Sequence, residues 1–258
     1  MEETAYAKIN LALRVLGKRA DGYHEIDTLF AFAEDGDRLK VAAGEGISLR
    51  ITGPFAADLD SGDDNLVVRA ARLLGEGRDA ALTLEKNLPV ASGIGGGSAD
   101  AAAALRLLCR WWNLHPGAEA LAGIARRIGA DVAACLRSRT MRGTGRGDSL
   151  IGVRQTYSGT PVLLVNPGVA VDTAEVFARW KRVRAGGNDL EPPALEIAPE
   201  IGDVLHLLRC QDGVRMARMS GSGATCFGLF STVESRDSAA AAIAAGRPGW
   251  WRLASRLW

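Results

Sequence analysis

The chain has 258 residues, which is enough to bury a sizeable core as one large domain or two medium ones. With 47% hydrophobic residues, 24% charged residues and a net charge of +1, the composition fits an ordinary globular protein and argues against broad attraction to nucleic acid or membranes. Four scattered cysteines and three dispersed histidines argue against a disulfide framework or a structural zinc site and favour a cytoplasmic protein. The acidic N-terminus does not read as a signal peptide, and no apolar run is long enough to span a bilayer.

The chain opens on an alternating segment from Ala5 to Val15, which predicts a strand. Lys8 and Asn10 fall on the same face of this strand, about 6.6–6.8 Å apart along its axis. Most lysines on strands are simply solvated, so a chemical role for Lys8 is the sharper alternative.

A polar turn over residues 17–25 brings Tyr23 and His24 together. The turn is either an ordinary surface loop or a flat aromatic platform beside a hydrogen-bonding group, which would suit a planar base. The segments that follow predict an α+β arrangement in which helices cover one face of a sheet. Strands are expected over 26–32, 38–41, 47–52 and 81–86, with a helix from 64 to 74.

A glycine-rich stretch then leads into an alanine-rich helix expected from Ala101 to Trp112. Unpaired N–H groups at a helix N-terminus attract phosphate, although a structural turn is the plain alternative. The stretch lacks the Lys-Ser/Thr ending of a P-loop and does not fit a dinucleotide fingerprint. If it is a structural turn, Asp100 is expected to balance the helix dipole. Its members are Pro89, Val90, Ala91, Ser92, Gly93, Ile94, Gly95, Gly96, Gly97, Ser98 and Ala99.

Beyond this helix, a second amphipathic helix is expected from Ala118 to Ile128. Asp131 follows as a lone carboxylate among small and apolar residues. It is either a helix N-cap, which the local sequence favours, or a partly buried acid for proton transfer. The Arg-Gly-Asp sequence at 146–148 lies in a tight turn, and we interpret it as a chance match to an adhesion signal.

The character of the sequence changes over residues 156–160, where we place a boundary between domains 1–157 and 158–258. A capping box at 172–175 predicts a helix through Trp180, with Thr173 as its cap or as a substrate contact. Residues 184–199 are expected to be a loop, and a second glycine-serine loop lies at 220–225. Further elements are expected at 162–165, 201–208, 214–219, 226–230, 238–245 and 250–257.

Several motifs occur in the order found in one family. They are Ala7-Lys8-Ile9-Asn10-Leu11, Gly17-Lys18-Arg19-x-Asp21-Gly22-Tyr23-His24, Asn65-Leu66-Val67-x-Arg69-Ala70, Lys86-x-Leu88-Pro89 with its loop, Gly129-Ala130-Asp131-Val132 and Met219-Ser220-Gly221-Ser222-Gly223-Ala224. The chain therefore resembles the 4-diphosphocytidyl-2-C-methyl-D-erythritol kinase family, within the superfamily of galactokinase, homoserine kinase, mevalonate kinase and phosphomevalonate kinase. The resemblance spans nearly the whole chain. Asp-Gly-Tyr-His together with the upstream Ala-Lys-Ile-Asn is specific to the family, whereas the glycine loop marks only the superfamily.

The resemblance implies an ATP-dependent kinase with a two-domain fold. The N-terminal domain would be like a domain of a small-subunit ribosomal protein, the C-terminal domain would be an α/β sandwich, and ATP would meet the substrate in the cleft between them. Lys8 and Asp131 would form the catalytic pair, since a nearby ammonium keeps a carboxylate ionised while the carboxylate orients a hydroxyl or accepts its proton. Residues 89–99 would cradle the ATP phosphates, with Ser98 near Mg²⁺.

The resemblance also implies a site for a cytidine diphosphate-linked polyol. Tyr23 and Phe177 would enclose the cytosine, and His24 would read its polar edge. The remaining substrate contacts would come from Asn10, Phe30, Thr173, Gly221 and Ser222. No nucleic acid or membrane partner is expected, and the protein would be a monomer or a weak homodimer.

The chain departs from the family pattern in a few places. Val132-Ala133-Ala134 stands where the family usually has Pro-Phe, which bears on rate more than on reaction type. Ile94 replaces a commoner leucine, and Asp148 replaces a glutamate.

Three alternatives stay open. Another kinase of the superfamily would have no use for Tyr23 and His24, because its substrates offer no base to stack. A non-catalytic ATP-binding sensor would not need Lys8 and Asp131. RNA binding is disfavoured by the net charge.

Overall fold

The computed structural model describes residues 1–154, 157–181 and 186–258, and the chain forms two compact units. Unit 1 comprises Met1–Ala7, Asp35–Val90 and Gly95–Ser138, and unit 2 comprises Lys8–Glu34, Ala91–Ile94 and Arg139–Trp258. Two long strands, β1 (Glu2–Lys18) and β2 (His24–Ala42), contribute residues to both units.

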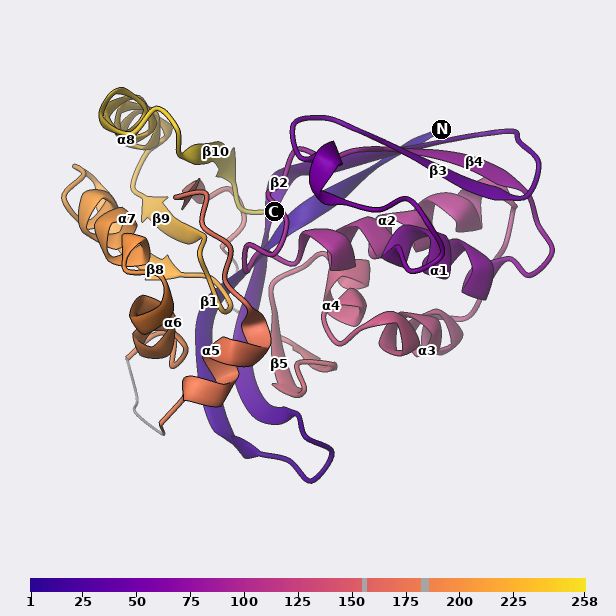
Figure 1. The fold of residues 1–258 in the computed structure, drawn as a ribbon, viewed down its shortest axis with the longest axis horizontal. Helices are drawn as coiled ribbons and strands as arrows, with labels where there is room; N and C mark the ends of the chain where they lie inside the picture. The colour runs from indigo at the N-terminus through magenta and orange to yellow at the C-terminus, as the bar shows by residue number, and fades with distance from the viewer. Residues whose placement is uncertain (155–156, 182–185) are drawn as a thin grey trace. The chain divides into compact units, whose positions relative to one another are not determined.

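In unit 1, a small sheet is covered by helices on one side (Figure 1). Strand β3 (Ile47–Thr52) runs parallel to β4 (Ala80–Glu85), and β4 pairs antiparallel with the end of β2. The helices are α1 (Leu66–Leu74), α2 (Gly96–Trp111), α3 (Ala118–Ile128) and α4 (Val132–Arg137), and a 3-10 turn, η1, spans Ala56–Asp58. Helix α2 is the central one, because its alanine run from Ala101 to Ala104 is completely buried.

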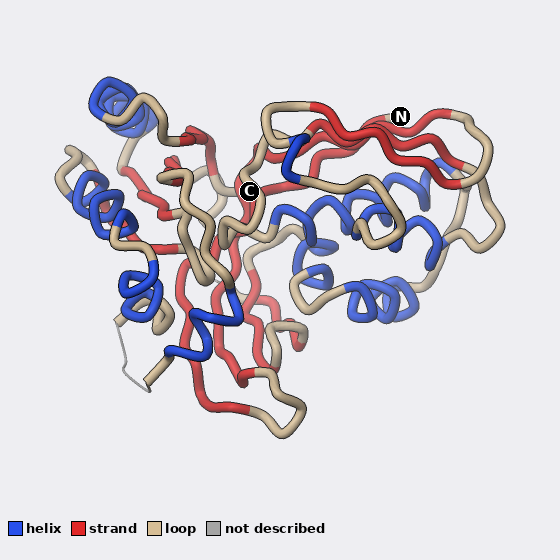
Figure 2. The backbone as a smooth tube through the Cα atoms, in the orientation of Figure 1, coloured by secondary structure: helices blue, strands red, loops and turns tan. Residues whose placement is uncertain are grey.

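Unit 2 contains two groups of strands, which Figure 2 shows in red. The first half of β2 pairs antiparallel with β5 (Met141–Gly145), which pairs with β6 (Ser149–Gly152). A second, fully antiparallel sheet has the order β10-β7-β9-β8. Its strands are β7 (Pro161–Asn166), β8 (Val214–Met219), β9 (Cys226–Phe230) and β10 (Trp251–Arg256).

Four helices accompany the second sheet and bury their apolar residues against it. They are α5 (Thr173–Arg179), α6 (Glu191–Ile197), α7 (Glu200–Arg209) and α8 (Val233–Gly246). Strands β7 and β9 are buried along nearly their whole length, which explains their continuous apolar sequences. None of the helices in the described ranges has the length and hydropathy needed to cross a bilayer.

The predicted α+β class is confirmed, and most predicted elements lie within a few residues of the observed ones. The two strands expected over 26–32 and 38–41 are one continuous strand, β2. The loop predicted over 184–199 is wrong from Glu191 onward, because that segment forms α6 with proline in its first turn. The predicted domain boundary at residues 156–160 falls partly outside the described ranges, because residue 156 is not described.

Candidate active site

Lys8 and Asn10 lie side by side on β1, as the alternation of the strand predicts. The Lys8 ammonium donates a hydrogen bond to Asn10 Oδ1 at 2.9 Å, and Asn10 Nδ2 donates to Thr28 Oγ1 on β2 at 2.8 Å. The Lys8 ammonium also lies 5.3 Å from the centre of the buried Phe30 ring. All of these side chains are buried, so a charged amine is held in a fixed place within unit 2.

The stretch Pro89–Ala99, which we call the first glycine loop, is anchored to β1. The backbone N–H of Lys8 donates to the Ile94 carbonyl at 3.0 Å. Gly93 has a φ of +78°, and a Cβ at this position would lie 2.7 Å from the carbonyl oxygen of Gly223. A side chain is therefore excluded at Gly93 both by backbone conformation and by space.

The segment Ser220–Thr225, which we call the second glycine loop, packs on Gly93. Ser220 Oγ donates to the Gly93 carbonyl at 3.1 Å and accepts from the backbone N–H of Asn10 at the same distance. The backbone N–H of Thr225 donates to the Ser92 carbonyl. The two loops and β1 therefore form one hydrogen-bonded assembly within unit 2.

The remaining part of the first glycine loop opens helix α2 in unit 1. Gly95 is the N-cap residue with a φ of +64°, and no side chain caps the helix. The N–H groups of its first turn have no acceptor inside the helix, which is the arrangement that binds phosphate. Gly97 has only the Leu66 side chain near its Cβ position, at 3.5 Å, so the backbone here is open to close approach.

A buried ion cluster lies directly behind this helix start. The Lys86 ammonium donates to Asp37 Oδ2 at 2.6 Å and to Asp100 Oδ2 at 2.7 Å, and all three side chains are buried. Asp37 Oδ1 accepts the backbone N–H groups of Asn87 and Leu88. The expectation that Asp100 balances the helix dipole is wrong, because its carboxyl is turned into this cluster instead of toward solvent.

The cluster holds two carboxyl groups against one ammonium, and this imbalance governs their protonation. Burial raises the pKa of Asp100 to about 8, and Lys86 opposes the rise. Burial alone would lower the pKa of Lys86, but the two carboxyl groups raise it overall. Among the residues that the structure describes, no group bonds to Asp100 Oδ1, which suits a neutral acid better than a carboxylate.

Asp131 lies in unit 1 at the N-cap position of α4. Its φ and ψ are −76° and −17°, and its side chain makes no capping hydrogen bond. The capping role that the local sequence favoured is therefore wrong, and the carboxylate is half-buried.

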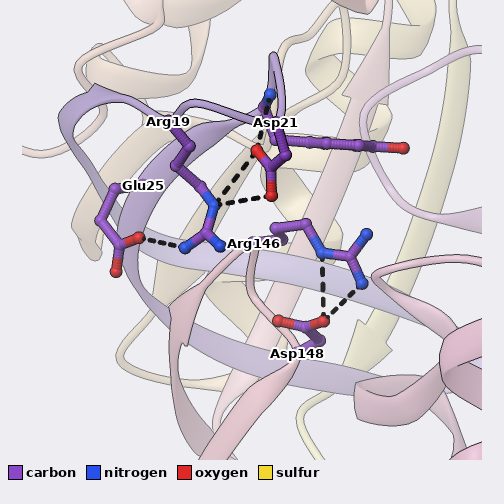
Figure 3. A network of polar contacts seen from close by, with 6 residues as sticks. Arg19, Asp21, Glu25, Arg146 and Asp148 are labelled. Atoms are coloured by element: carbon purple, nitrogen blue, oxygen red, sulfur yellow. Dashed lines mark hydrogen bonds and ion pairs between the residues drawn. The ribbon is translucent and has the colours of Figure 1, made fainter.

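The turn after β1 is a charged surface loop (Figure 3). Arg19 pairs with Asp21 at 3.1 Å and Glu25 at 2.6 Å. From the turn between β5 and β6, the Arg146 guanidinium lies 5.0 Å from the centre of the Tyr23 ring. Tyr23 itself is 55% exposed, so its ring is a platform with a cation stacked against it.

The Arg-Gly-Asp sequence of the same turn has a structural use. Arg146 binds Asp148 within the turn at 2.8 Å, as Figure 3 shows. The aspartate therefore fixes the arginine that contacts Tyr23. We keep the interpretation that the resemblance to an adhesion signal is chance.

His24 lies against Phe177 of α5. The two rings are 4.7 Å apart and inclined by 24°, and Trp180 meets His24 edge-on at 6.1 Å. Burial, with a smaller effect of Lys18, lowers the pKa of His24, so the imidazole is neutral at pH 7 and offers one donor and one acceptor. The His24 ring therefore stacks on the Phe177 ring.

Thr173 does not cap α5. Asp172 is the N-cap residue and accepts the backbone N–H of Glu175 at 2.8 Å. The Thr173 hydroxyl is instead hydrogen-bonded to Ser222 Oγ of the second glycine loop at 2.8 Å. The structure thus brings together two of the residues predicted for the substrate.

Asn188 was not predicted as a site residue, yet it holds the backbone at the second glycine loop. Its Nδ2 donates to the carbonyl groups of Met219 and Gly221, at 2.9 and 2.8 Å, and it is 1% exposed. The neighbouring Asp189 accepts the N–H of Val15 on β1. A local signal was present, since Asn and Asp before a proline-containing helix start are typical of a helix boundary.

A magnesium ion would find few protein ligands. Within the described residues, no group of three or more histidine, cysteine, aspartate or glutamate side chains is arranged to hold a metal ion. The Ser98 hydroxyl, in the first turn of α2, is an oxygen donor of the kind that Mg²⁺ accepts alongside phosphate oxygens and water. The donor set therefore fits an ion that arrives with a nucleotide better than a resident metal.

Comparison with known proteins gives a consistent result along the chain. The family model for the GHMP kinases N terminal domain matches residues 65–139, and that for the GHMP kinases C terminal matches residues 175–248. The chain is 51% identical to a 4-diphosphocytidyl-2-C-methyl-D-erythritol kinase of Rhizorhabdus wittichii, covering 99% of this chain and 94% of that protein. A relative of the same name from Parvibaculum lavamentivorans is 49% identical, with 96% and 95% covered.

Solved structures agree with this result. A crystal structure of 4-(cytidine 5'-diphospho)-2C-methyl-D-erythritol kinase has a TM-score of 0.83 and 32% identity, covering 100% of this chain and 99% of that one. Homoserine kinase from Cytophaga hutchinsonii has a TM-score of 0.71 at 19% identity, covering 98% and 95%, and shares the fold.

Proposed function

Because the chain belongs to the 4-diphosphocytidyl-2-C-methyl-D-erythritol kinase family, we propose that it transfers the γ-phosphoryl group of ATP to the 2-hydroxyl of 4-diphosphocytidyl-2-C-methyl-D-erythritol. This reaction belongs to non-mevalonate isoprenoid precursor biosynthesis. The single observation that carries the proposal is the 51% identity over 99% of the chain. The fixed ammonium of Lys8 supports it independently, since phosphoryl transfer needs a cation placed before the substrates arrive.

We assign the chemistry to Lys8 and Asp131. The Asp131 carboxylate would orient the substrate hydroxyl or accept its proton, and the Lys8 ammonium would stabilise the charge that develops in transfer. The open amides at the start of α2 support a phosphate site in the first glycine loop, residues 89–99. Mg²⁺, with Ser98 as its candidate protein ligand, would neutralise charge on the nucleotide phosphates when bound.

We assign the diphosphocytidyl group to the loop around Tyr23. The exposed Tyr23 ring and the Phe177 ring provide stacking surface, and neutral His24 provides a donor and an acceptor for the polar edge of cytosine. The polyol end would contact a second set of residues. It comprises Asn10, Phe30, Thr173, Gly221 and Ser222.

In functional terms we divide the chain into an ATP-binding domain, residues 1–157, and a substrate-side domain, residues 158–258. We place the protein in the cytoplasm, as a monomer or a weak homodimer, where both small-molecule substrates are available.

The decisive experiment measures ATP consumption with a panel of alcohol acceptors. The cytidylated methylerythritol should be phosphorylated, while methylerythritol 4-phosphate, homoserine, mevalonate and galactose should not. CDP should inhibit competitively against the cytidylated acceptor. Phosphorylation of a plain alcohol at a comparable kcat/KM would assign the chain to another kinase activity of the superfamily, and no turnover with any acceptor would indicate a sensor.

A matched pair of variants tests the residue assignment. Asp131→Asn should lose turnover by about 10³-fold or more while ATP affinity changes little, since general base and charge contributions are of this order. Asp58→Asn, at an exposed carboxylate of η1, should leave both quantities unchanged. An Asp131→Asn enzyme with near-normal turnover would refute the assignment.

A further inference from the structure

We propose that Thr28 of β2 is a positioning residue, which sets the direction of the Lys8 ammonium through the Asn10 side-chain amide. The inference rests on the proposed function, because it assumes that Lys8 acts in phosphoryl transfer. It concerns one chain of hydrogen bonds that runs from the Ala12 carbonyl to Thr28, Asn10 and Lys8.

The direction of this chain is dictated by the chemistry of its members. Thr28 Oγ1 donates to the Ala12 carbonyl at 2.7 Å, and a carbonyl oxygen can only accept. A hydroxyl has one hydrogen, so Thr28 Oγ1 must accept its other bond, at 2.8 Å, from Asn10. The group facing Thr28 is therefore the NH₂ of the amide.

The opposite end of the amide is fixed by the same argument. With its NH₂ directed at Thr28, Asn10 presents Oδ1 to Lys8, whose ammonium has three donors and no acceptor. In this arrangement each of the three hydrogen bonds joins a donor to an acceptor. A rotated amide would instead place NH₂ against the ammonium and carbonyl oxygen against an oxygen whose only hydrogen is already committed.

Burial makes this polarity consequential. Thr28 is 1% exposed, Asn10 is 2% exposed and Lys8 is 4% exposed, so bulk water cannot replace a lost partner. The backbone N–H of Asn10 is also held by Ser220 Oγ of the second glycine loop, which fixes the residue while its side-chain amide can still rotate. Thr28 and Lys8 thus favour the same orientation of the amide, and Thr28 holds its Nδ2 end in place.

Thr28→Val tests the inference, because valine has the shape of threonine but can neither donate nor accept. It should lower kcat by about 10-fold, the factor that corresponds to one buried hydrogen bond of ordinary strength. The KM for ATP should change by less than about 2-fold, since no ATP contact is assigned to this chain of bonds. Thr28→Ser keeps the hydroxyl and should restore kcat to within about 2-fold of the parent.

Two controls separate the possible failures. Thr52→Val removes a hydroxyl that donates to a strand carbonyl in unit 1 at 3.4 Å, and it should leave kcat unchanged. Melting temperatures are measured for every variant, and if Thr28→Val does not fold, Thr28→Ala, which introduces no branched side chain, takes its place.

The inference is overturned if a folded Thr28→Val or Thr28→Ala enzyme keeps kcat within about 2-fold, or if Thr28→Ser is as impaired as valine. Lys8→Met tests the premise in the same assay. A near-normal kcat for Lys8→Met would overturn the proposed role of Lys8. A large loss in Lys8→Met together with a fully active Thr28→Val would overturn only the positioning role.

Discussion

The ion cluster of Lys86, Asp37 and Asp100 predicts an unusual dependence of stability on pH. Burial raises the pKa of Asp100 to about 8, whereas an aspartate in the unfolded chain has a pKa of about 3.9. Between these values the folded protein holds a proton that the unfolded chain has released. The stabilisation that Asp100 gives by holding this proton is therefore complete below the pKa of aspartate in the unfolded chain, and it is lost as the pH rises through the pKa of Asp100 in the folded protein.

The size of the effect follows from the one proton involved. One proton difference changes the free energy of unfolding by about 1.4 kcal/mol per pH unit, or about 2.7 kcal/mol between pH 5 and pH 7. Asp100→Asn keeps the shape of the side chain and an oxygen that can accept from Lys86, but it cannot titrate. The variant should therefore gain about 2.7 kcal/mol relative to the parent protein over this range.

Urea unfolding at pH 5, 6 and 7 measures this difference directly. Other titrating groups, including His24, are common to both proteins, so their contributions cancel in the comparison. Asp63→Asn is the control, because Asp63 is exposed and its hydrogen bond to Arg72 lowers its pKa, which places its titration below this range. Parallel stability curves for the parent and Asp100→Asn would refute the reasoning.

Further variants test the loops and the platform. Gly93→Ala should destabilise the fold by about 3 kcal/mol in urea unfolding, since its Cβ would lie 2.7 Å from the Gly223 carbonyl oxygen. Gly22 also has a positive φ but has open space around it, so Gly22→Ala should destabilise the fold by only about 1 kcal/mol. Equal losses in the two variants would contradict the steric argument. Tyr23→Ala should raise the KM for the cytidylated substrate about 10-fold in steady-state kinetics and leave the KM for ATP unchanged, and a matching rise for both would argue against stacking. Asn188→Ala should lower kcat/KM for the same substrate about 10-fold, because the carbonyl groups of Met219 and Gly221 lose their donor. Unchanged kinetics in a folded variant would show that the second glycine loop keeps its shape without Asn188.

The sequence predicted those site features that depend on local periodicity. Lys8 and Asn10 are two residues apart on a strand, so their proximity follows from the alternation of side chains. The glycine loop before α2 was likewise evident from its composition. In each case the relevant neighbour is close in sequence, and simple backbone geometry determines the outcome.

Features that depend on contacts between distant segments were not predicted. Asp100 was expected to balance the helix dipole if the glycine-rich stretch were a structural turn, but its carboxyl pairs with Lys86 in the interior. Asn188 was assigned to a loop because its surroundings are rich in proline and glycine, and its partners, Met219 and Gly221, lie more than thirty positions away. Neither pairing leaves a periodic signal in the sequence.

The pairing of strands within unit 2 has a consequence for synthesis on the ribosome. The backbone N–H of Trp258 donates to the Phe32 carbonyl, and Leu257 forms an isolated antiparallel β-bridge with Ala33. Strand β10 pairs with β7 at the edge of the second sheet. During synthesis, the edge of β7 that β10 covers therefore stays unpaired until residues 251–256 have left the exit tunnel. Newly made molecules should depend on chaperones during translation, and ribosome-bound chains stalled before residue 251 should be cut readily by protease within unit 2.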